Sequence, residues 1–346
     1  MKQIIILGHF GFGKNKVNGQ TIKTKIVAQA TIRHFGEENV QLEDTQGGWK
    51  FLVRLPFLIF CLLYKGKNII ILPSKKGALF IPPILTTLNR LFHRHLYYVS
   101  IGRCLVHHAK RFSNLKDCLN RFQQIYVETP KMANSLKELG LKNICQMPNC
   151  KPLEILSKNE IQSSFEAPYR LCTFSRIIKE KGIEDAIQAV RICNDNAGKE
   201  VFALDIYGQV EDQSWFNNLM IGQPKYIQYR GIIPYHQTTS TLKDYFALLF
   251  PTYYNGEAFA GTLIDALAAG LPALASDWHD NSDIVIPGQT GYIFPTHSVE
   301  ALTAILQNCA VHPENLLQMR QHCIVQAQQY QPDVVLSPLF RSIEAL

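Results

Sequence analysis

The chain has 346 residues, of which 47% are hydrophobic and 18% charged, a composition that excludes a disordered chain and predicts two domains. Its longest uncharged apolar run, 55–64, falls far short of the about 20 residues that a membrane-spanning helix needs. The apolar run near the start, 4–7, is too short for the core of a secretory signal peptide. Nine cysteines form no CxxC motif and no Cys/His cluster, so we expect a cytoplasmic protein without structural zinc or disulfides.

Positive charge is concentrated in the first half of the chain. Residues 1–152 carry 23 Lys and Arg against 7 Asp and Glu, whereas residues 153–346 carry 12 against 21. This asymmetry predicts an anionic partner for the first half: a lipid surface, a phosphorylated acceptor or nucleic acid. A basic face that only keeps the protein in solution is the alternative. Nucleic acid is disfavoured, because the aromatic residues lie mostly in apolar runs and not between Lys and Arg.

Short apolar runs alternate with helical patterns in the first half, which is typical of βαβ units with a parallel sheet. We predict strands at 3–7, 68–72, 96–100, 124–128 and 144–147, and helices at 19–35 and 131–139. Residues 49–64 are apolar nearly all round. They predict a helix that is either buried or lies on a membrane, and we favour the buried position.

The second half repeats the alternation after a polar segment, 151–168, in which the charge changes sign. We predict strands at 170–175, 202–207, 226–229, 247–250 and 272–275, and helices at 183–194, 262–269, 301–306 and 313–330. The predicted domains are an N-terminal Rossmann-like domain, 1–152, and a C-terminal one, 168–330. Residues 331–346 are expected to pack back on the first domain. Two α/β domains facing across a cleft are the simplest architecture.

A glycine cluster, Gly8-His9-Phe10-Gly11-Phe12-Gly13, follows the first predicted strand. It fails the GxGxxG spacing, because Lys16 stands three residues after Gly13, and no recognisable second strand ends in an acidic residue at the usual interval. A nicotinamide site is therefore poorly supported. A loop that lets the backbone approach an anionic ligand at the start of the next helix fits better.

Two cations follow the first strand of the second domain. Arg176 and Lys181 would lie at the carboxyl edge of a parallel sheet, where they can converge on one diphosphate. A pair of exposed surface cations is the alternative interpretation.

Two acids flank the start of the predicted helix 262–269. The eight-residue spacing of Glu257 and Asp265 corresponds to roughly 12 Å, with the helix N-terminus between the two carboxylates. Carboxylates accept hydrogen bonds from hydroxyls, and helix N–H groups favour phosphate, so the layout matches a nucleotide-sugar. The alternative is one acid that favours the helix dipole and one exposed Asp.

Together these motifs resemble the retaining GT-B glycosyltransferases of family 4, whose E-x7-E signature corresponds to Glu257-x7-Asp265. The other matching motifs are Ser175-Arg176, Lys181-Gly182, Tyr207-Gly208, Gly231, Pro251, Ala269-Gly270-Leu271-Pro272 and Gly288-x-x-Gly291. In the first half, 98–105, 127–129 and 147–149 resemble bacterial capsular and exopolysaccharide glycosyltransferases. The resemblance covers nearly the whole chain and implies the GT-B architecture, two Rossmann-like domains with parallel sheets.

The resemblance also implies residue roles. Glu257 would contact the donor hexose, Asp265 the ribose, and Arg176 and Lys181 the diphosphate. The remaining donor-binding positions would be Gly11, Gly13, Gly19, Gly208, Phe259, Ala260, Gly261 and Thr262. The acceptor-side positions would be Gly102, Arg103 and His107, although His107 with His108 also fits a plain surface pair. His279 is a further acceptor-side candidate, because it follows a predicted strand end that would face the cleft.

The resulting prediction is a cytoplasmic hexosyltransferase that moves a sugar from a nucleotide-sugar, expected to be a UDP-sugar, to a glycan or lipid-linked acceptor. It needs no cofactor or metal, and its basic domain would contact the inner face of the plasma membrane. Two alternatives stay open. One is an inactive binding subunit, suggested by Arg103 and by Asp265 where the family usually has Gly and Glu. The other is a GT-B epimerase or phosphorylase.

Overall fold

The computed structural model describes residues 2–11, 19–45, 48–257 and 259–345. The chain divides into two compact units: unit 1 contains Met1–Pro152 and Gln331–Leu346, and unit 2 contains Leu153–Tyr330. Each unit is built on a six-stranded parallel sheet, which confirms the predicted α/β class. No helix in the described part of the chain combines the length and apolarity needed to cross a membrane.

The sheet of unit 1 has the strand order β2-β1-β3-β4-β5-β6. Its strands are β1 (Lys2–Gly8), β2 (Val40–Asp44), β3 (Gly66–Leu72), β4 (His95–Val99), β5 (Gln124–Val127) and β6 (Ile144–Gln146). Side chains alternate along β1: Ile5 and Leu7 enter one hydrophobic core, while Ile4 and Ile6 enter another. Both faces are therefore buried, which explains the continuous apolar run of this strand.

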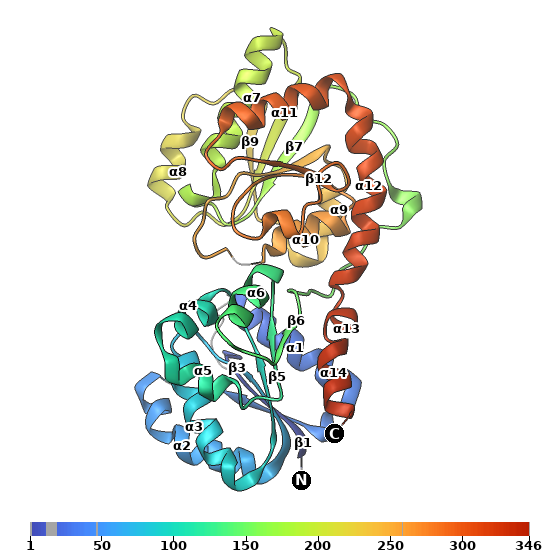
Figure 1. Cartoon of the computed structure of the whole chain (residues 1–346). Coiled ribbons are helices and arrows are strands. Elements are labelled where there is room, and N and C mark those ends of the chain that lie inside the picture. The colour runs from blue at the N-terminus through green and yellow to red at the C-terminus, as the bar shows by residue number, and fades with distance from the viewer. Residues whose placement is uncertain (1, 12–18, 46–47, 258, 346) are drawn as a thin grey trace. The chain divides into compact units, whose positions relative to one another are not determined.

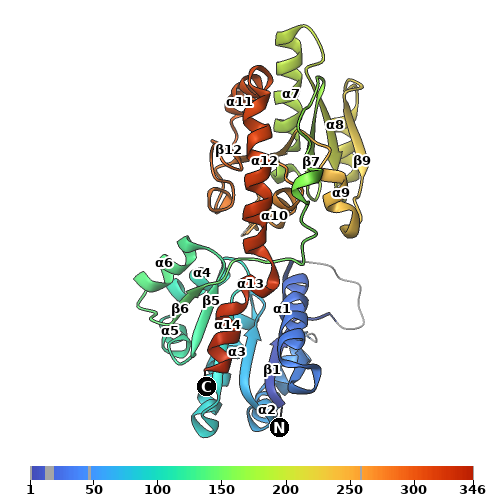
Figure 2. The same cartoon turned by 90° about the vertical axis from the view of Figure 1, so that its right-hand side faces the viewer.

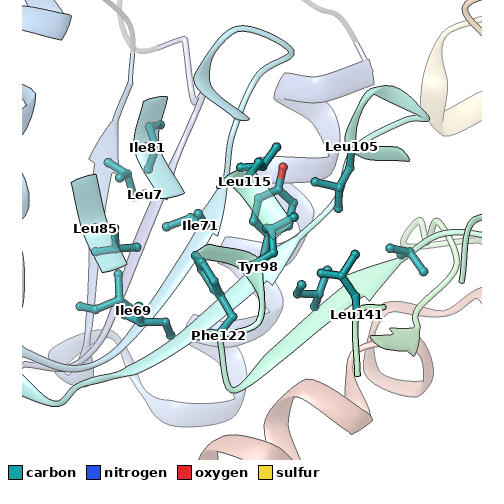
Figure 3. Close-up of a cluster of buried hydrophobic side chains, with 14 of the residues drawn as sticks. Leu7, Ile69, Ile71, Ile81, Leu85, Tyr98, Leu105, Leu115, Phe122 and Leu141 are labelled. Carbon is teal, nitrogen blue, oxygen red and sulfur yellow. The ribbon is translucent and has the colours of Figure 1, made fainter. Parts of the chain in front are cut away.

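Helices cover both faces of this sheet. The core around Leu7, Ile69 and Tyr98 (Figure 3) is closed by α2 (Gly48–Lys65), α3 (Gly77–Phe92), α4 (Cys104–Arg111), α5 (Ser113–Leu119) and α6 (Pro130–Glu138). The opposite core is closed by α1 (Gly19–Phe35), α13 (Pro332–Val335) and α14 (Ser337–Glu344). Both views show the last helices, in red, beside α1, in blue (Figures 1 and 2). The Tyr97 hydroxyl of β4 donates a hydrogen bond to the Ser342 carbonyl at 3.0 Å.

The sheet of unit 2 has the strand order β12-β11-β10-β7-β8-β9. Its strands are β7 (Tyr169–Phe174), β8 (Phe202–Tyr207), β9 (Ile227–Gly231), β10 (Ala247–Phe250), β11 (Ala273–Ser276) and β12 (Gly291–Phe294). The chain runs outward from β7 to β9 and then returns to the other side of β7 with β10. The loops after β7 and β10 consequently diverge, and ligands of open parallel sheets bind at such a switch point.

Two apolar layers also flank the sheet of unit 2. One contains α7 (Ile183–Ala197), α8 (Gln213–Met220) and α11 (Val299–Val311), and the other contains α9 (Thr238–Leu242) and α10 (Gly261–Ala268). The long helix α12 (Pro313–Ala327) contributes side chains to both layers.

Two expectations about unit 1 are corrected by the structure. The predicted strands did not include β2, which ends in acidic residues, and Asp44 Oδ1 accepts a hydrogen bond from the Phe10 backbone N–H at 3.2 Å. Asp44 lies 31 residues after Gly13, whereas the dinucleotide fingerprint has its acid after about 20, so the interval is still not the usual one. Strand β2 is a half-buried edge strand in which apolar and polar residues alternate, so it lacks the continuous apolar run by which the other strands were predicted. The second correction concerns α2, which is buried on one face only: Phe57 and Tyr64 are largely exposed.

Candidate active site

A lysine–glutamate pair lies at the switch point of unit 2. Lys181 ends the short 3₁₀ turn Lys179–Lys181 that follows β7, and Glu257 lies in the loop between β10 and α10. The Lys181 ammonium donates to Glu257 Oε2. The exposed fractions of the side chains are 7% and 15%, so the pair is shielded while the glutamate keeps some access to solvent.

The loop after β10 is fixed by its own side chains. The Thr252 hydroxyl oxygen lies 3.5 Å from Glu257 Oε2 and accepts a hydrogen bond from the Tyr254 backbone N–H at 3.2 Å. The Trp278 indole N–H donates to the Tyr254 carbonyl oxygen at 2.9 Å. This loop is therefore held both from within and from the segment after β11, which keeps Glu257 at the sheet edge.

The Tyr254 ring brings the two predicted cations together. The Arg176 guanidinium lies 5.1 Å from the ring centroid and the Lys181 ammonium 5.5 Å. Both distances are within the range of cation–π contacts. Arg176 also pairs with Glu211 at 2.7 Å, on an exposed rim. The two cations thus border one aromatic surface at the carboxyl edge of β7.

Helix α10 begins beside this pair. It starts at Gly261, after Ala260, whose side chain has no polar atom that could cap the first turn. The N–H groups of the first turn of a helix favour an anion. Asp265 lies one turn further along and is buried. The pKa of Tyr235 is raised by burial and then by the Asp265 carboxylate, which places Asp265 near that phenol.

A second lysine–glutamate pair lies at the carboxyl edge of unit 1. Lys23 Nζ of α1 is 2.5 Å from Glu128 Oε1 and 3.2 Å from the Ser100 carbonyl oxygen. Glu128 Oε2 accepts a hydrogen bond from the Gly102 backbone N–H at 3.2 Å. The exposed fractions of the two side chains are only 3% and 4%. The pair fixes the turn after β4, where Gly102 has a φ of 69° and Arg103 is exposed.

The family described as glycosyl transferases group 1 matches residues 157–329, half of the chain and nearly all of unit 2. The chain belongs to this family. The prediction of a glycosyltransferase of the GT-B type is thereby confirmed.

Among curated relatives of this glycosyltransferase is the GtfA subunit of the UDP-N-acetylglucosamine–peptide N-acetylglucosaminyltransferase of Streptococcus pneumoniae serotype 4. It is 26% identical over 63% of this chain and 44% of its own length. The amylovoran biosynthesis glycosyltransferase AmsK of Erwinia amylovora is 24% identical over 42% of this chain and 37% of its own length. The chain thus spans less than half the length of either relative.

Among solved structures, Alr3699/HepE of Anabaena, crystallised with UDP, has the same fold. Its TM-score is 0.75 at 13% sequence identity, and the match covers 99% of this chain and 100% of that chain. At this identity the likeness concerns the fold alone.

The other predicted donor positions are placed as follows. Gly208, with a φ of 147°, packs so closely on the Ser175 carbonyl that a Cβ would clash, so it shapes the loop after β8. The Phe259 side chain is buried, and its ring packs edge-on against that of Tyr330. Gly11 and Gly19 lie at the carboxyl edge of unit 1, after β1 and at the start of α1. Gly13 is outside the described residues.

The acceptor-side histidines differ in their surroundings. His107 is exposed on α4, whereas the neighbouring His108 is buried. Burial and then the nearby His107, Lys75 and Arg111 lower the pKa of His108. His279, after β11, has a left-handed φ of 52° and its ring lies against that of Trp278.

Several residues of this glycosyltransferase were not found from the sequence. Thr252 contacts Glu257, and the Tyr254 ring contacts the two cations. These contacts depend on the conformation of the loop, which no sequence motif predicts. Glu128 could have been predicted, because it is an acid directly after an apolar strand, and a buried carboxylate needs a buried partner of opposite charge. Among the described residues, no group of three or more His, Cys, Asp and Glu side chains is arranged to hold a metal ion.

Proposed function

We propose that the protein transfers a sugar from a UDP-sugar, with retention, to a glycan or lipid-linked acceptor in the assembly of a bacterial surface polysaccharide. The observation that carries this proposal is the arrangement of Lys181, Glu257 and Arg176 around Tyr254, beside the N-terminus of α10. It combines positive charge for a diphosphate with a carboxylate for sugar hydroxyls at a topological switch point.

The reaction needs stabilisation of the leaving group, because negative charge develops on the departing diphosphate. Arg176, Lys181 and the first turn of α10 would supply it as fixed, preorganised charge. Glu257 would accept a hydrogen bond from a hexose hydroxyl while keeping Lys181 in place. Asp265 would accept one from the ribose. The proposal includes no metal ion or cofactor, because these groups would supply the positive charge.

Retention would follow from attack on the face that the diphosphate leaves. In this mechanism an oxygen of the donor phosphate takes the proton of the acceptor hydroxyl, while the hydroxyl oxygen forms the new glycosidic bond. No enzyme nucleophile is then required. The acceptor-side residues of unit 1 would be Gly102, Arg103 and His107, and that of unit 2 would be His279.

The names of related proteins support the choice of UDP and of a polysaccharide product. One relative is named for UDP-N-acetylglucosamine, another for amylovoran biosynthesis, and the Anabaena structure was solved with UDP. The excess of Lys and Arg in residues 1–152 supports a peripheral contact with an anionic membrane at the cytoplasmic face.

The direct test is incubation of the purified protein with UDP-, GDP- and ADP-sugars, each carrying a radiolabelled sugar, and lipid-linked acceptors. We expect label to pass from a UDP-sugar to the acceptor, with the anomeric configuration retained in the product. Transfer from another nucleotide alone would overturn the choice of UDP. Epimerised sugar as the product would indicate the GT-B epimerase. In a parallel incubation of a glycan with inorganic phosphate, release of a sugar phosphate would indicate the phosphorylase. Tight UDP binding without transfer would indicate the inactive binding subunit.

A further inference from the structure

Helix α2 of unit 1 has two apolar faces. Leu55, Ile59, Leu62 and Leu63 point into the core and are essentially inaccessible. The other face carries a row of side chains spaced four, three and four residues apart, which aligns them along one side of a helix. These are Val53, Phe57, Phe60 and Tyr64, with exposed fractions of 69%, 75%, 45% and 68%.

The exposed row continues onto α3. The two helices pack side by side (Figure 1), and the Phe60 ring meets the Phe92 ring edge-on, with centroids 5.3 Å apart. The neighbouring Leu91 is 76% exposed. We call Val53, Phe57, Phe60, Tyr64 and Leu91 the α2–α3 apolar surface. Single exposed apolar residues are common, but a contiguous set of this kind marks a surface that is covered by something.

Basic residues border the α2–α3 apolar surface. Lys65 and Arg90 are exposed at the ends of the two helices, and the Arg94 Nε–H donates to the carbonyl oxygen of Leu63 in the last turn of α2 at 2.9 Å. The pKa of His95 is lowered by burial and then by the charges of Lys67 and Arg94, so positive charge gathers at this end.

The sequence around this surface lacks any opposing charge. Between Asp44 and Asp117 there is no Asp or Glu over 72 residues, which contain 12 Lys and Arg. This stretch supplies α2, α3 and α4. A partner of α2 and α3 therefore meets an apolar row on helices that carry Lys and Arg but no Asp or Glu.

We propose that the α2–α3 apolar surface inserts into the headgroup region of an anionic lipid bilayer, with α2 lying in the plane of the interface. The inference deepens the membrane contact of the proposed function, and rests on it, by naming the surface and by adding apolar insertion to charge attraction. Helices of this kind, with aromatic and aliphatic residues on one side and Lys and Arg beside them, bind at membrane interfaces.

The charge pattern favours a bilayer over a second copy of the chain. In a two-fold symmetric dimer the same patch contacts itself, so the basic borders would face each other and repel. A bilayer that contains anionic lipids supplies both an apolar layer and the complementary charge. A protein partner would need an acidic rim around an apolar groove.

The orientation of α2 connects this surface with the acceptor side. Helix α2 leads into the parallel strand β3, so its N-terminal end lies towards the carboxyl edge of the sheet. Val53 is nearest that end, and the turn with Gly102 follows β4 at the same edge. A lipid-linked acceptor held in the bilayer would thus approach the edge that carries the proposed acceptor residues.

Vesicle flotation tests the proposal on the full chain without donor. The vesicles are phosphatidylcholine alone or mixed with phosphatidylglycerol, in about 0.1 M and about 1 M salt, between which the screening length falls from about 10 Å to about 3 Å. We expect binding to the anionic vesicles in low salt and a reduced but measurable fraction in high salt, because apolar contacts are not screened. The double substitution Phe57→Ser/Tyr64→Ser should lower the partition coefficient tenfold or more and abolish the high-salt fraction.

Two matched variants make the result specific. Ile221→Ser removes an equally exposed apolar side chain from unit 2 and should bind vesicles like the wild type. Lys65→Glu/Arg90→Glu should weaken binding in low salt, whereas reversal of the exposed Lys225 of unit 2 should have little effect. Unchanged melting temperatures show that the variants are folded.

The proposal is overturned if Phe57→Ser/Tyr64→Ser floats with anionic vesicles like the wild type, or if the wild type does not bind them. It is equally overturned if light scattering finds a wild-type dimer that this double variant breaks, since a second copy then covers the surface. The proposed function is measured separately, through UDP binding without vesicles. Vesicle binding without UDP binding would thus refute the UDP donor site and leave the lipid surface standing. UDP binding without vesicle binding would refute the lipid surface and leave the donor site standing.

Discussion

The two units contain the same ion pair, a lysine with a glutamate at the carboxyl edge of a parallel sheet, in different surroundings. In unit 1, Lys23 and Glu128 are buried, and each makes a second hydrogen bond to the backbone, Lys23 to the Ser100 carbonyl oxygen and Glu128 from the Gly102 N–H. In unit 2, Lys181 and Glu257 are more accessible and lie beside Tyr254 and a helix N-terminus. The unit 1 pair is bound to the backbone and stabilises a turn. In the unit 2 pair, Glu257 is more accessible to solvent and further positive charge lies nearby, so this pair can exchange its partners for a ligand.

The largest expected effect is a loss of folding stability when the Lys23–Glu128 pair of unit 1 is broken. Lys23→Met leaves the buried Glu128 carboxylate without its cation and should lower the free energy of unfolding by about 3–5 kcal/mol. The double variant Lys23→Met/Glu128→Gln should recover part of this loss, because no unpaired charge remains. Chemical denaturation of both variants measures the difference. If Lys23→Met alone is as stable as the wild type, the structural role of this pair is refuted.

The next effect concerns catalysis. Lys181→Ala should lower turnover about 10²–10³-fold, because a preorganised positive charge next to the leaving diphosphate is lost. Lys179→Ala, in the same 3₁₀ turn but exposed, is the matched control and should retain activity. Initial rates of sugar transfer at saturating donor make the comparison. Equal rates for Lys181→Ala and the wild type would remove Lys181 from the mechanism.

A third prediction concerns Asp205 of unit 2, a buried carboxylate that accepts hydrogen bonds from three side chains. Burial opposes ionisation of Asp205, but hydrogen bonds from Arg170, Arg230 and Tyr245 outweigh it and lower its pKa below the ordinary 3.8. A lowered folded-state pKa gives stability that is present above 3.8 and lost as the pH falls through the lower value. Asp205→Asn should therefore cost about 2–3 kcal/mol at neutral pH and weaken the acid dependence of unfolding. An unchanged acid dependence in Asp205→Asn would contradict this.

The smallest effect concerns Asp265, which is buried but one turn from the proposed ligand side. Asp265→Asn keeps the shape and removes the charge, so UDP should bind about tenfold more weakly through a lost charge-assisted hydrogen bond to the ribose. Calorimetric titration with UDP gives the value, and titration with a 2′,3′-dideoxyuridine diphosphate is the control. A loss of affinity of the same size for both ligands would contradict the ribose contact.

Sequence patterns predicted the interior of both sheets well. The strands β8 and β10 match the predicted ranges 202–207 and 247–250, and α1 matches 19–35. Doubly buried parallel strands are continuous apolar runs, which explains this success. The edge strand β2 was missed because half of its residues are polar. The mostly polar helix α4 and the apolar helix α3, which is interrupted by Pro82 and Pro83, were missed as well.

The candidate site was predictable only where chemistry follows a motif. Lys181 was indicated by its place with Arg176 after a strand, and Glu257 by its spacing from Asp265 around a helix start, but nothing indicated that Lys181 and Glu257 pair with each other. Thr252 and Tyr254 became visible only with the loop in place, because their contacts run through space between β7 and β10. The exposed face of α2 was misjudged for a related reason, since an all-round apolar helix looks the same whether a protein or a lipid covers it.

The most direct test of the donor site is the melting temperature of the wild type and of Lys181→Ala with UDP, GDP and ADP. A nucleotide at about 100 times its dissociation constant adds about 2.7 kcal/mol of stability, which is readily seen as a shift. The account predicts a clear shift of the wild type with UDP, a much smaller one for Lys181→Ala, and little with GDP or ADP. Equal UDP shifts in both proteins, or none in the wild type, would contradict a donor site built on Lys181 and Glu257.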